Sequence, residues 1–373
     1  MTRSVAALVT TYAPTRCGIA RYSAALADSL LLWGRETDIF RIVQSGEAAS
    51  QDLRVVMEFN PASAVSIEAA QRALSRYPVV MVQHEFGIFG PDDGRAVIDL
   101  LEGVKVPVMV VLHTVPLRPS DSQRKILHSL AESASVLVVP SHAARVGLED
   151  VYGITADQAV VLPHGSTWEP AEQSSGDRHR LITWGLLGPG KGIERAIAAV
   201  GELHDLRPPI SYRIVGQTHP NVLKRQGFAY RSQLEGLVRR QGLEHRILLD
   251  DGYKPETDLQ KIVAAADLVV IPYDNNEQAC SGVLTDALAA GRPVVATAFP
   301  HAVELLGSGA GLLVSHDDPA EMGKAIRTLL SDDIAYRRAV TQARYQARRL
   351  AWPEVARRFE ELLGRLSASL AVG

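Results

Sequence analysis

The stretch CSGVLTDALAAGRPVVAT, Cys280–Thr297, places a small-residue turn, a short apolar helix pattern and a β-branched run directly after one another. Ser281 and Gly282 stand where the helix would begin, and Gly-Arg-Pro ends it. The following run does not alternate between apolar and polar residues, which is typical of a strand that is buried on both faces of a parallel sheet. The stretch therefore predicts one unit of a parallel α/β fold.

Apolar runs of the same kind occur on both sides of this stretch, and helical patterns separate most of them. They lie at Ser4–Thr10, Thr37–Val43, Leu53–Phe59, Pro78–Gln83, Val106–Leu112, Ser135–Pro140 and Ala159–Pro163, then at Arg180–Gly185, Ser211–Gly216, Arg246–Asp250, Asp267–Tyr273, Arg292–Thr297 and Gly311–Val314. Two doubly wound, Rossmann-like domains that face a cleft are expected from this order.

The domain boundaries follow from composition. Residues 166–180, STWEPAEQSSGDRHR, are polar, aperiodic and rich in turn formers, so they are predicted to link residues 1–165 to residues 181–350. Residues 351–373 hold an amphipathic helical pattern with no strand after it, and we expect this helix to brace the first domain. A chain of 373 residues is long enough for two cores.

Charge and cysteine content exclude several classes of protein. The formal net charge is -3, so no global field favours nucleic acid as a partner. Two cysteines, Cys17 and Cys280, do not make a disulfide framework and indicate a reducing compartment. The sequence has no apolar run of about 18 residues that would span a membrane. A cytoplasmic protein is expected, with peripheral contact at the inner membrane face left open and no oligomeric state predicted.

Three turns suggest sites for a phosphate group. Ser281 and Gly282 would present free N–H groups at the positive end of a helix dipole, and Asp286 lies one turn further on, where it could accept hydrogen bonds from sugar hydroxyls. The plainer interpretation is an N-cap with an early acid. Lys191, in GLLGPGKG, and Gly18, in the first strand–helix turn, would add a charge and a bare backbone, although both also fit ordinary turns.

These motifs, in this order, resemble the GT-B glycosyltransferases, specifically the retaining enzymes of family 4. The resemblance covers nearly the whole chain and includes PTRCGIARY, QHEFGIFG, LHT, PSHAARVGL, LPHGS, GPGKGIERAI, IVGQTHP, IPYDNNEQACSGVLTDALAAGRPVVAT and FPHAVELL. QHEFGIFG together with SGVLTDALAAGRPVVAT is most similar to a bacterial mannosyltransferase-like subgroup.

The resemblance implies roles for particular residues. His113, Lys191 and Gln278 would be catalytic, and the donor would be bound by Gly18, Lys191, Ser281, Gly282, Val283 and Asp286. His84, Glu85, Phe86 and Gly87 would lie on the acceptor side. Two departures stand out: the family's pair of glutamates, eight residues apart, is here Gln278 and Asp286, and the arginine that often precedes the lysine is missing.

The implied reaction transfers a hexose, with mannose as the first expectation, from a nucleoside-diphosphate sugar to a hydroxyl of a glycan, a lipid-linked acceptor or a small molecule, with retention. GDP-mannose is the expected donor and a UDP-sugar is the alternative; no metal or other cofactor is expected, because no His, Asp and Glu residues have metal-ligand spacing. A GT-B epimerase or phosphorylase, or a non-catalytic sugar-nucleotide-binding protein, are the other functions that the sequence leaves open.

Overall fold

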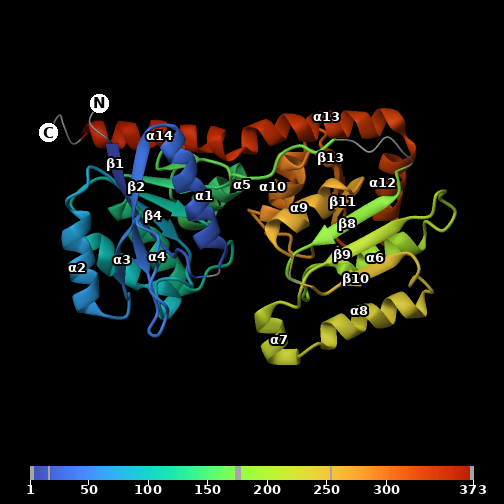
Figure 1. The fold of residues 1–373 in the computed structure, drawn as a ribbon, viewed down its shortest axis with the longest axis horizontal. Coiled ribbons are helices and arrows are strands. Elements are labelled where there is room, and N and C mark those ends of the chain that lie inside the picture. Colours follow the sequence, from blue (N-terminus) through green and yellow to red (C-terminus); the bar gives the residue numbers. More distant parts are fainter. Residues whose placement is uncertain (1–3, 16, 173–177, 253, 370–373) are drawn as a thin grey trace. The chain divides into compact units, whose positions relative to one another are not determined.

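The computed structural model describes residues 4–15, 17–172, 178–252 and 254–369. The chain forms two compact units (Figure 1). The first contains Met1–Gly165 together with Trp352–Gly373, and the second contains Ser166–Ala351. Each unit is built around its own parallel sheet, so the two are considered one at a time.

The first unit has a seven-stranded sheet in the order β3-β2-β1-β4-β5-β6-β7. Its strands are β1 Ser4–Thr10, β2 Arg35–Ile42, β3 Val55–Phe59, β4 Val80–His84, β5 Val108–Leu112, β6 Val136–Val139 and β7 Ala159–Val161. Its helices are α1 Gly18–Leu32, α2 Ala64–Leu74, α3 Ala96–Glu102, α4 Asp121–Ser133, α5 His142–Tyr152 and α14 Trp352–Ser369, with a short 3-10 turn at Asp92–Gly94. Every strand pair is parallel.

Helix α14 completes the core of the first unit. Val355, Phe359 and Leu363 are fully buried against α1 and the strands of this sheet. The buried guanidinium of Arg35 donates to both oxygens of Glu360, at 2.6 and 2.8 Å. The indole of Trp33 donates to the Pro353 carbonyl at 2.8 Å. The expected C-terminal helix that braces the first unit is thus confirmed.

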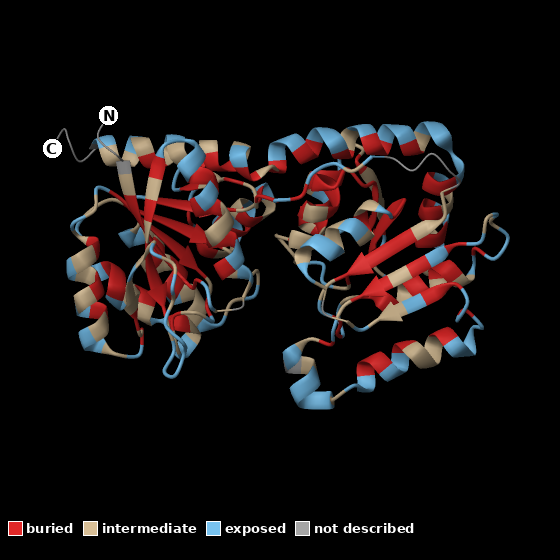
Figure 2. Cartoon of the chain, in the orientation of Figure 1, coloured by how far each residue is buried: buried red, intermediate tan, exposed pale blue. Residues whose placement is uncertain are grey.

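The second unit has a six-stranded parallel sheet in the order β10-β9-β8-β11-β12-β13. Its strands are β8 Arg180–Trp184, β9 Ser211–Val215, β10 Ile247–Asp250, β11 Leu268–Ile271, β12 Val294–Thr297 and β13 Gly311–Val314. Its helices are α6 Ile193–Gly201, α7 Pro220–Gln226, α8 Ala229–Arg240, α9 Glu256–Ala264, α10 Gly282–Ala289, α11 Pro300–Leu306, α12 Pro319–Ser331 and α13 Asp333–Leu350. Figure 2 shows that buried residues dominate the strands of both sheets.

Each apolar run that predicts a strand overlaps one in the structure. The physical reason is the burial of both sheet faces, which requires continuous apolar sequence: all four residues of β11, for example, are buried. The interpretation of residues 166–180 as a linker differs from what the structure describes of them. Trp168 is buried and stacks on Trp184 at 5.7 Å between ring centroids, so the segment joins the core of the second unit from its start. Residues 173–177 of that stretch lie outside the described part of the chain.

Across the described residues, none of the helices combines the length and the apolar composition that crossing a bilayer would demand.

Candidate functional site

The topology of each sheet creates one position where neighbouring strands send their connections to opposite faces. In the first unit it lies between β1 and β4, and in the second between β8 and β11. Ligands of doubly wound folds bind at the carboxyl ends of the strands at such a position. Several predicted residues lie at these ends: His84 is the last residue of β4, Gly18 follows β1, and Lys191 and Ser281 follow β8 and β11.

Lys191 lies in the turn between β8 and α6. Its ammonium nitrogen lies 4.1 Å from the centre of the Tyr273 ring, which follows β11, so a cation–π contact holds it at the switch position. The Asp274 amide donates to the Gly190 carbonyl at 3.0 Å and ties the two loops together. Burial lowers the pKa of Lys191. A partly desolvated cation of this kind is suited to an anionic group.

The N-terminus of α10 lies at the same switch position. Ser281 is its N-cap, and the Ser281 hydroxyl accepts from the Leu284 amide at 3.3 Å. The Ser281 amide donates to Nδ1 of the buried His301 at 2.9 Å, so it already has a partner. The prediction that the Ser281 amide binds phosphate therefore needs correction, because His301 occupies it. The amides of Gly282 and Val283 open the helix instead, and Val283 lies beside the backbone of Gly185 at the end of β8.

Gln278 lies in the loop before α10. Its side-chain amide donates to the Cys280 carbonyl at 2.9 Å, and its backbone carbonyl accepts from the backbone amide of His301 at 3.3 Å. Both contacts shape the loop in front of the helix. Gln278 carries no negative charge where the resembling family has a glutamate, so its observed contacts are those of a loop-forming residue.

Asp286 faces a partner that the sequence does not predict. The Ser166 hydroxyl donates to Asp286 Oδ1 at 2.8 Å and accepts from the Trp168 amide at 3.1 Å. Asp286 is half-buried one turn into α10, so one carboxylate oxygen helps to hold the segment that enters the second unit. This position suits two roles, an early-helix acid and a group that binds sugar hydroxyls.

A pair of variants separates them. Asp286→Ala is expected to weaken binding of a nucleoside diphosphate by tenfold or more, because charge-assisted hydrogen bonds contribute about 1.5–3 kcal/mol each. Ser166→Ala is the control: it removes the same intramolecular hydrogen bond, at about 1 kcal/mol of stability, and should keep nucleotide affinity. Calorimetric titration of both variants measures the difference. Equal affinity in the two would assign Asp286 a structural role only.

The first turn of the first unit begins at Gly18, which is exposed and would meet nothing if it carried a Cβ. Its bare backbone is thus open on the ligand side rather than required by packing. Cys17 caps the helix, accepting from the Ala20 amide at 3.4 Å. The fully buried Arg41 donates from Nε to the Tyr12 carbonyl at 3.0 Å and from Nη1 to Glu58 at 2.5 Å. These bonds hold the loop after β1 in place.

Two histidines lie at the carboxyl ends of neighbouring strands, His84 as the last residue of β4 and His113 directly after β5. His113 Nε2 shares a hydrogen bond of 2.7 Å with the side-chain amide of Gln83. Its ring meets the edge of Tyr22 at 4.7 Å between centroids. Burial, with smaller contributions from His164 and His84, lowers the pKa of His113 to about 3. His113 is therefore a neutral group at neutral pH.

His84 is fully buried, and neither of its ring nitrogens has a hydrogen-bond partner among the described residues. Its ring contacts Phe86 at 5.0 Å and Phe89 at 6.2 Å between centroids. Burial lowers the pKa of His84 to about 3. His84 packs beneath the loop after β4. Its position therefore gives no support to the predicted direct contact with the acceptor.

The low pKa of His84 predicts a pH-dependent stability. An unfolded histidine has a pKa near 6.5, so between about pH 6.5 and 3 the unfolded chain binds a proton that the native chain does not. The neutral His84 therefore makes its full contribution to the free energy of unfolding above pH 6.5. As the pH falls to 5, that free energy decreases by about 2 kcal/mol. Urea unfolding at pH 7.5 and 5 should show that His84→Leu loses less free energy of unfolding between the two pH values than the unaltered protein does. The same substitution at exposed His245 should keep the original slope.

The loop after β4 holds the other acceptor-side residues. Glu85 accepts from the Thr114 hydroxyl at 2.5 Å and from the Phe86 amide at 3.0 Å, which joins the loops after β4 and β5. Phe86 is buried, whereas Gly87 is exposed. Gly94 has a φ of +80°, and a Cβ there would lie 2.5 Å from the Phe86 carbonyl oxygen. The loop is therefore closely packed around Phe86, with Gly87 at its surface.

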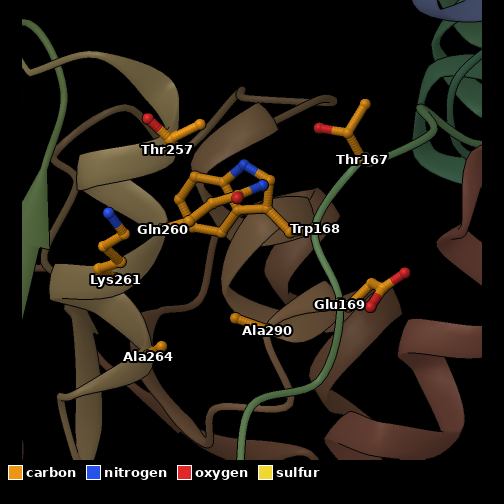
Figure 3. A pocket seen from close by; sticks show the side chains of 8 residues that line it. All are labelled: Thr167, Trp168, Glu169, Thr257, Gln260, Lys261, Ala264 and Ala290. Atoms are coloured by element: carbon orange, nitrogen blue, oxygen red, sulfur yellow. The ribbon is translucent and has the colours of Figure 1, made fainter.

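A hollow of about 430 Å³ lies elsewhere in the second unit (Figure 3). Thr167, Trp168 and Glu169 line one side of it and α9 lines the other. Glu256, the first residue of α9, accepts from the Thr167 hydroxyl at 2.9 Å and from the Trp168 indole at 3.3 Å, which joins the two sides. None of the predicted site residues lines this hollow.

Sequence reasoning missed Tyr273, His301, Gln83 and Arg41. An arginine inside the apolar run TDIFRIV and a histidine after the strand RPVVAT were the available signals. Among the residues that the structure describes, no group of three or more His, Cys, Asp or Glu side chains could hold a metal ion.

Two doubly wound parallel sheets in one chain, with a terminal helix returned to the first, define the GT-B fold. Sucrose-phosphate synthase from Thermosynechococcus elongatus superposes with a TM-score of 0.77 at 19% identity, covering 98% of this chain and 100% of that one. Anabaena Alr3699/HepE, solved in complex with UDP and glucose, gives a TM-score of 0.73 at 17% identity over 97% of this chain and all of its own. These similarities establish the fold.

Residues 178–332, which lie within the second unit, match the family model Glycosyl transferases group 1. The chain is also similar to curated D-inositol 3-phosphate glycosyltransferases. The protein of Corynebacterium efficiens is 28% identical over 65% of this chain and 59% of its own length, and that of Kineococcus radiotolerans is 30% identical over 61% and 56%. The chain thus spans somewhat less than two thirds of the length of these relatives.

Proposed function

We propose that the protein is a retaining glycosyltransferase that moves a hexose from a nucleoside-diphosphate sugar to a hydroxyl group. One observation carries the proposal: Lys191 and the N-terminus of α10 lie at the switch position of a glycosyl transferases group 1 domain. An ammonium group and free amides are what a departing diphosphate needs, since charge builds on it in the transition state. No metal ion is then required.

The remaining residues support this reaction in the following roles. Asp286 would hold sugar hydroxyls of the donor, and Gly18 would leave room for its phosphate. His113 would contact the transferred sugar as a neutral group. The departing phosphate would take the acceptor proton on the same face, so no protein base is needed. Mannose from GDP-mannose is the proposed transfer, and a UDP-sugar is the alternative, in keeping with the UDP complexes of Alr3699/HepE.

The acceptor is proposed to be small, polyhydroxylated and phosphorylated, in line with the names of the relatives. Loops after β4 and β5 would receive it. A basic face of α4, with Arg118 nearby, is less suited to bind the acceptor, because Arg124 donates to the Val151 carbonyl and covers the Tyr152 ring at 5.4 Å.

The test is a transfer assay with GDP-mannose and UDP-sugars in EDTA, using inositol phosphates and sugar phosphates as acceptors. Release of nucleoside diphosphate that depends on the acceptor, with retained configuration in the product, is the expected result. Tight nucleotide binding with no transfer would favour the non-catalytic sugar-nucleotide-binding alternative, which the neutral Gln278 also favours. Failure of every donor to bind would overturn the proposal.

A further inference from the structure

The outer face of α13 combines positive charge with exposed apolar side chains. Ile334, Arg338, Thr341, Tyr345 and Arg349 follow each other at spacings of four and three residues, which places them on one face of the helix. Ile334 is 82% exposed and Tyr345 is 55% exposed. Arg337, Arg344 and Arg348 are also exposed and flank this row. These eight residues are called the arginine face below.

Most of the charge of the arginine face has no acidic counterpart in its own segment. The chain as a whole has more acidic than basic residues, yet no Asp or Glu occurs between Asp333 and Glu354. Within the described part of the chain, none of the five arginines forms an ion pair with a carboxylate, although Arg178 and, to a smaller extent, Arg337 lower the pKa of Asp333 at the start of α13. Arg344 donates to the Ala171 carbonyl at 3.1 Å, and Arg349 lies 5.9 Å from the ring of Tyr345.

The opposite face of α13 is fixed in the second unit. Tyr336, Ala343 and Leu350 are buried, and the Tyr336 hydroxyl donates to the Asp267 carbonyl at 3.1 Å. Figure 2 shows the buried and exposed sides along the helix. The arginine face is therefore a rigid, straight stripe about 22 Å long, at 1.5 Å per residue.

We propose that the arginine face binds the surface of an anionic lipid membrane. Clusters of four to eight basic residues on an amphipathic helix are attracted to anionic lipids at about 1 kcal/mol per residue. Tyr345 is suited to the headgroup region, where aromatic side chains collect. Ile334 would be removed from water where the headgroups meet the acyl chains. A nucleic acid would offer Tyr345 a base to stack on but would give Ile334 no apolar partner, so a lipid surface accounts for the whole face.

The experiment is sedimentation of the full chain with phosphatidylglycerol–phosphatidylcholine vesicles and with pure phosphatidylcholine vesicles, without substrate. Binding to the anionic vesicles alone, weakened by salt, is expected. Arg348→Gln with Arg349→Gln should weaken it about 30-fold, at about 1 kcal/mol per arginine. The control exchanges Arg239 and Arg240, an exposed pair in the last turn of α8, for glutamine and should bind like the unaltered protein.

Tyr345→Ser tests the apolar contribution, and it should weaken vesicle binding while leaving its salt dependence unchanged. Three results would overturn the proposal: no binding to anionic vesicles at low salt, equal loss in the α8 control, or binding of RNA or DNA with no binding of vesicles. All are read without transfer activity, so they are independent of the proposed function.

Discussion

Lys191→Ala is expected to lower kcat about 100- to 1,000-fold, which corresponds to the loss of one preorganised electrostatic contact worth about 2.7–4 kcal/mol in the transition state. The reason lies in where the charge is held. The ammonium group lies over the Tyr273 ring, partly removed from water, at the switch position where a diphosphate would leave. There it would act on charge that develops during the reaction, so kcat should fall more than the affinity for the donor.

The same substitution should cost little stability. Lys191 contributes a cation–π contact of about 0.5–2 kcal/mol, and its backbone amide keeps the bond to the Gly188 carbonyl at 3.2 Å. Lys261→Ala is the matched control, because Lys261 is an exposed lysine of the same unit. Steady-state kinetics and urea unfolding of both variants provide the comparison. A Lys191→Ala protein that folds and retains normal kcat would remove Lys191 from the mechanism.

The strands and the positions of the candidate site could be predicted because they depend on local sequence. A strand covered on both faces must be apolar throughout, and a helix N-terminus needs only a capping residue and a turn before it. The partners of the site residues could not be predicted in the same way. Ser166 and Asp286 are 120 residues apart in the chain, and Ser281 and His301 are separated by 20.

The buried arginine is a second kind of example. Arg41 lies in an apolar run, so the sequence alone would predict a charged side chain among apolar neighbours with no partner. The structure supplies acceptors from several separate segments, including the carbonyls of Tyr12 and Ala48 and the carboxylates of Glu47 and Glu58. Pairing of this kind depends on which loops meet at the sheet edge, and that is decided by the tertiary fold.

Gly192→Ala is expected to destabilise the protein by more than ~3 kcal/mol or to prevent folding, since backbone strain and a steric clash add together. Gly192 is the N-cap of α6 and has a φ of +61°. A Cβ at this position would lie 1.7 Å from the Pro272 carbonyl oxygen and 2.7 Å from Asp274 Oδ1. The turn that holds Lys191 is therefore packed directly against the loop after β11, with no room for a methyl group.

Gly190→Ala is a control two residues away in the same turn. Gly190 has a φ of +91°, but a Cβ there would meet no atom within 4 Å, so only backbone strain of roughly 1–3 kcal/mol is expected. Chemical unfolding of the two variants isolates the clash from the strain. If the clash is as the structure describes, any folded Gly192→Ala protein should also bind nucleoside diphosphate more weakly than Gly190→Ala, because the Lys191 turn and the Tyr273 loop could no longer approach. Equal stability and equal nucleotide affinity in the two variants would contradict the close contact on which the proposed donor site depends.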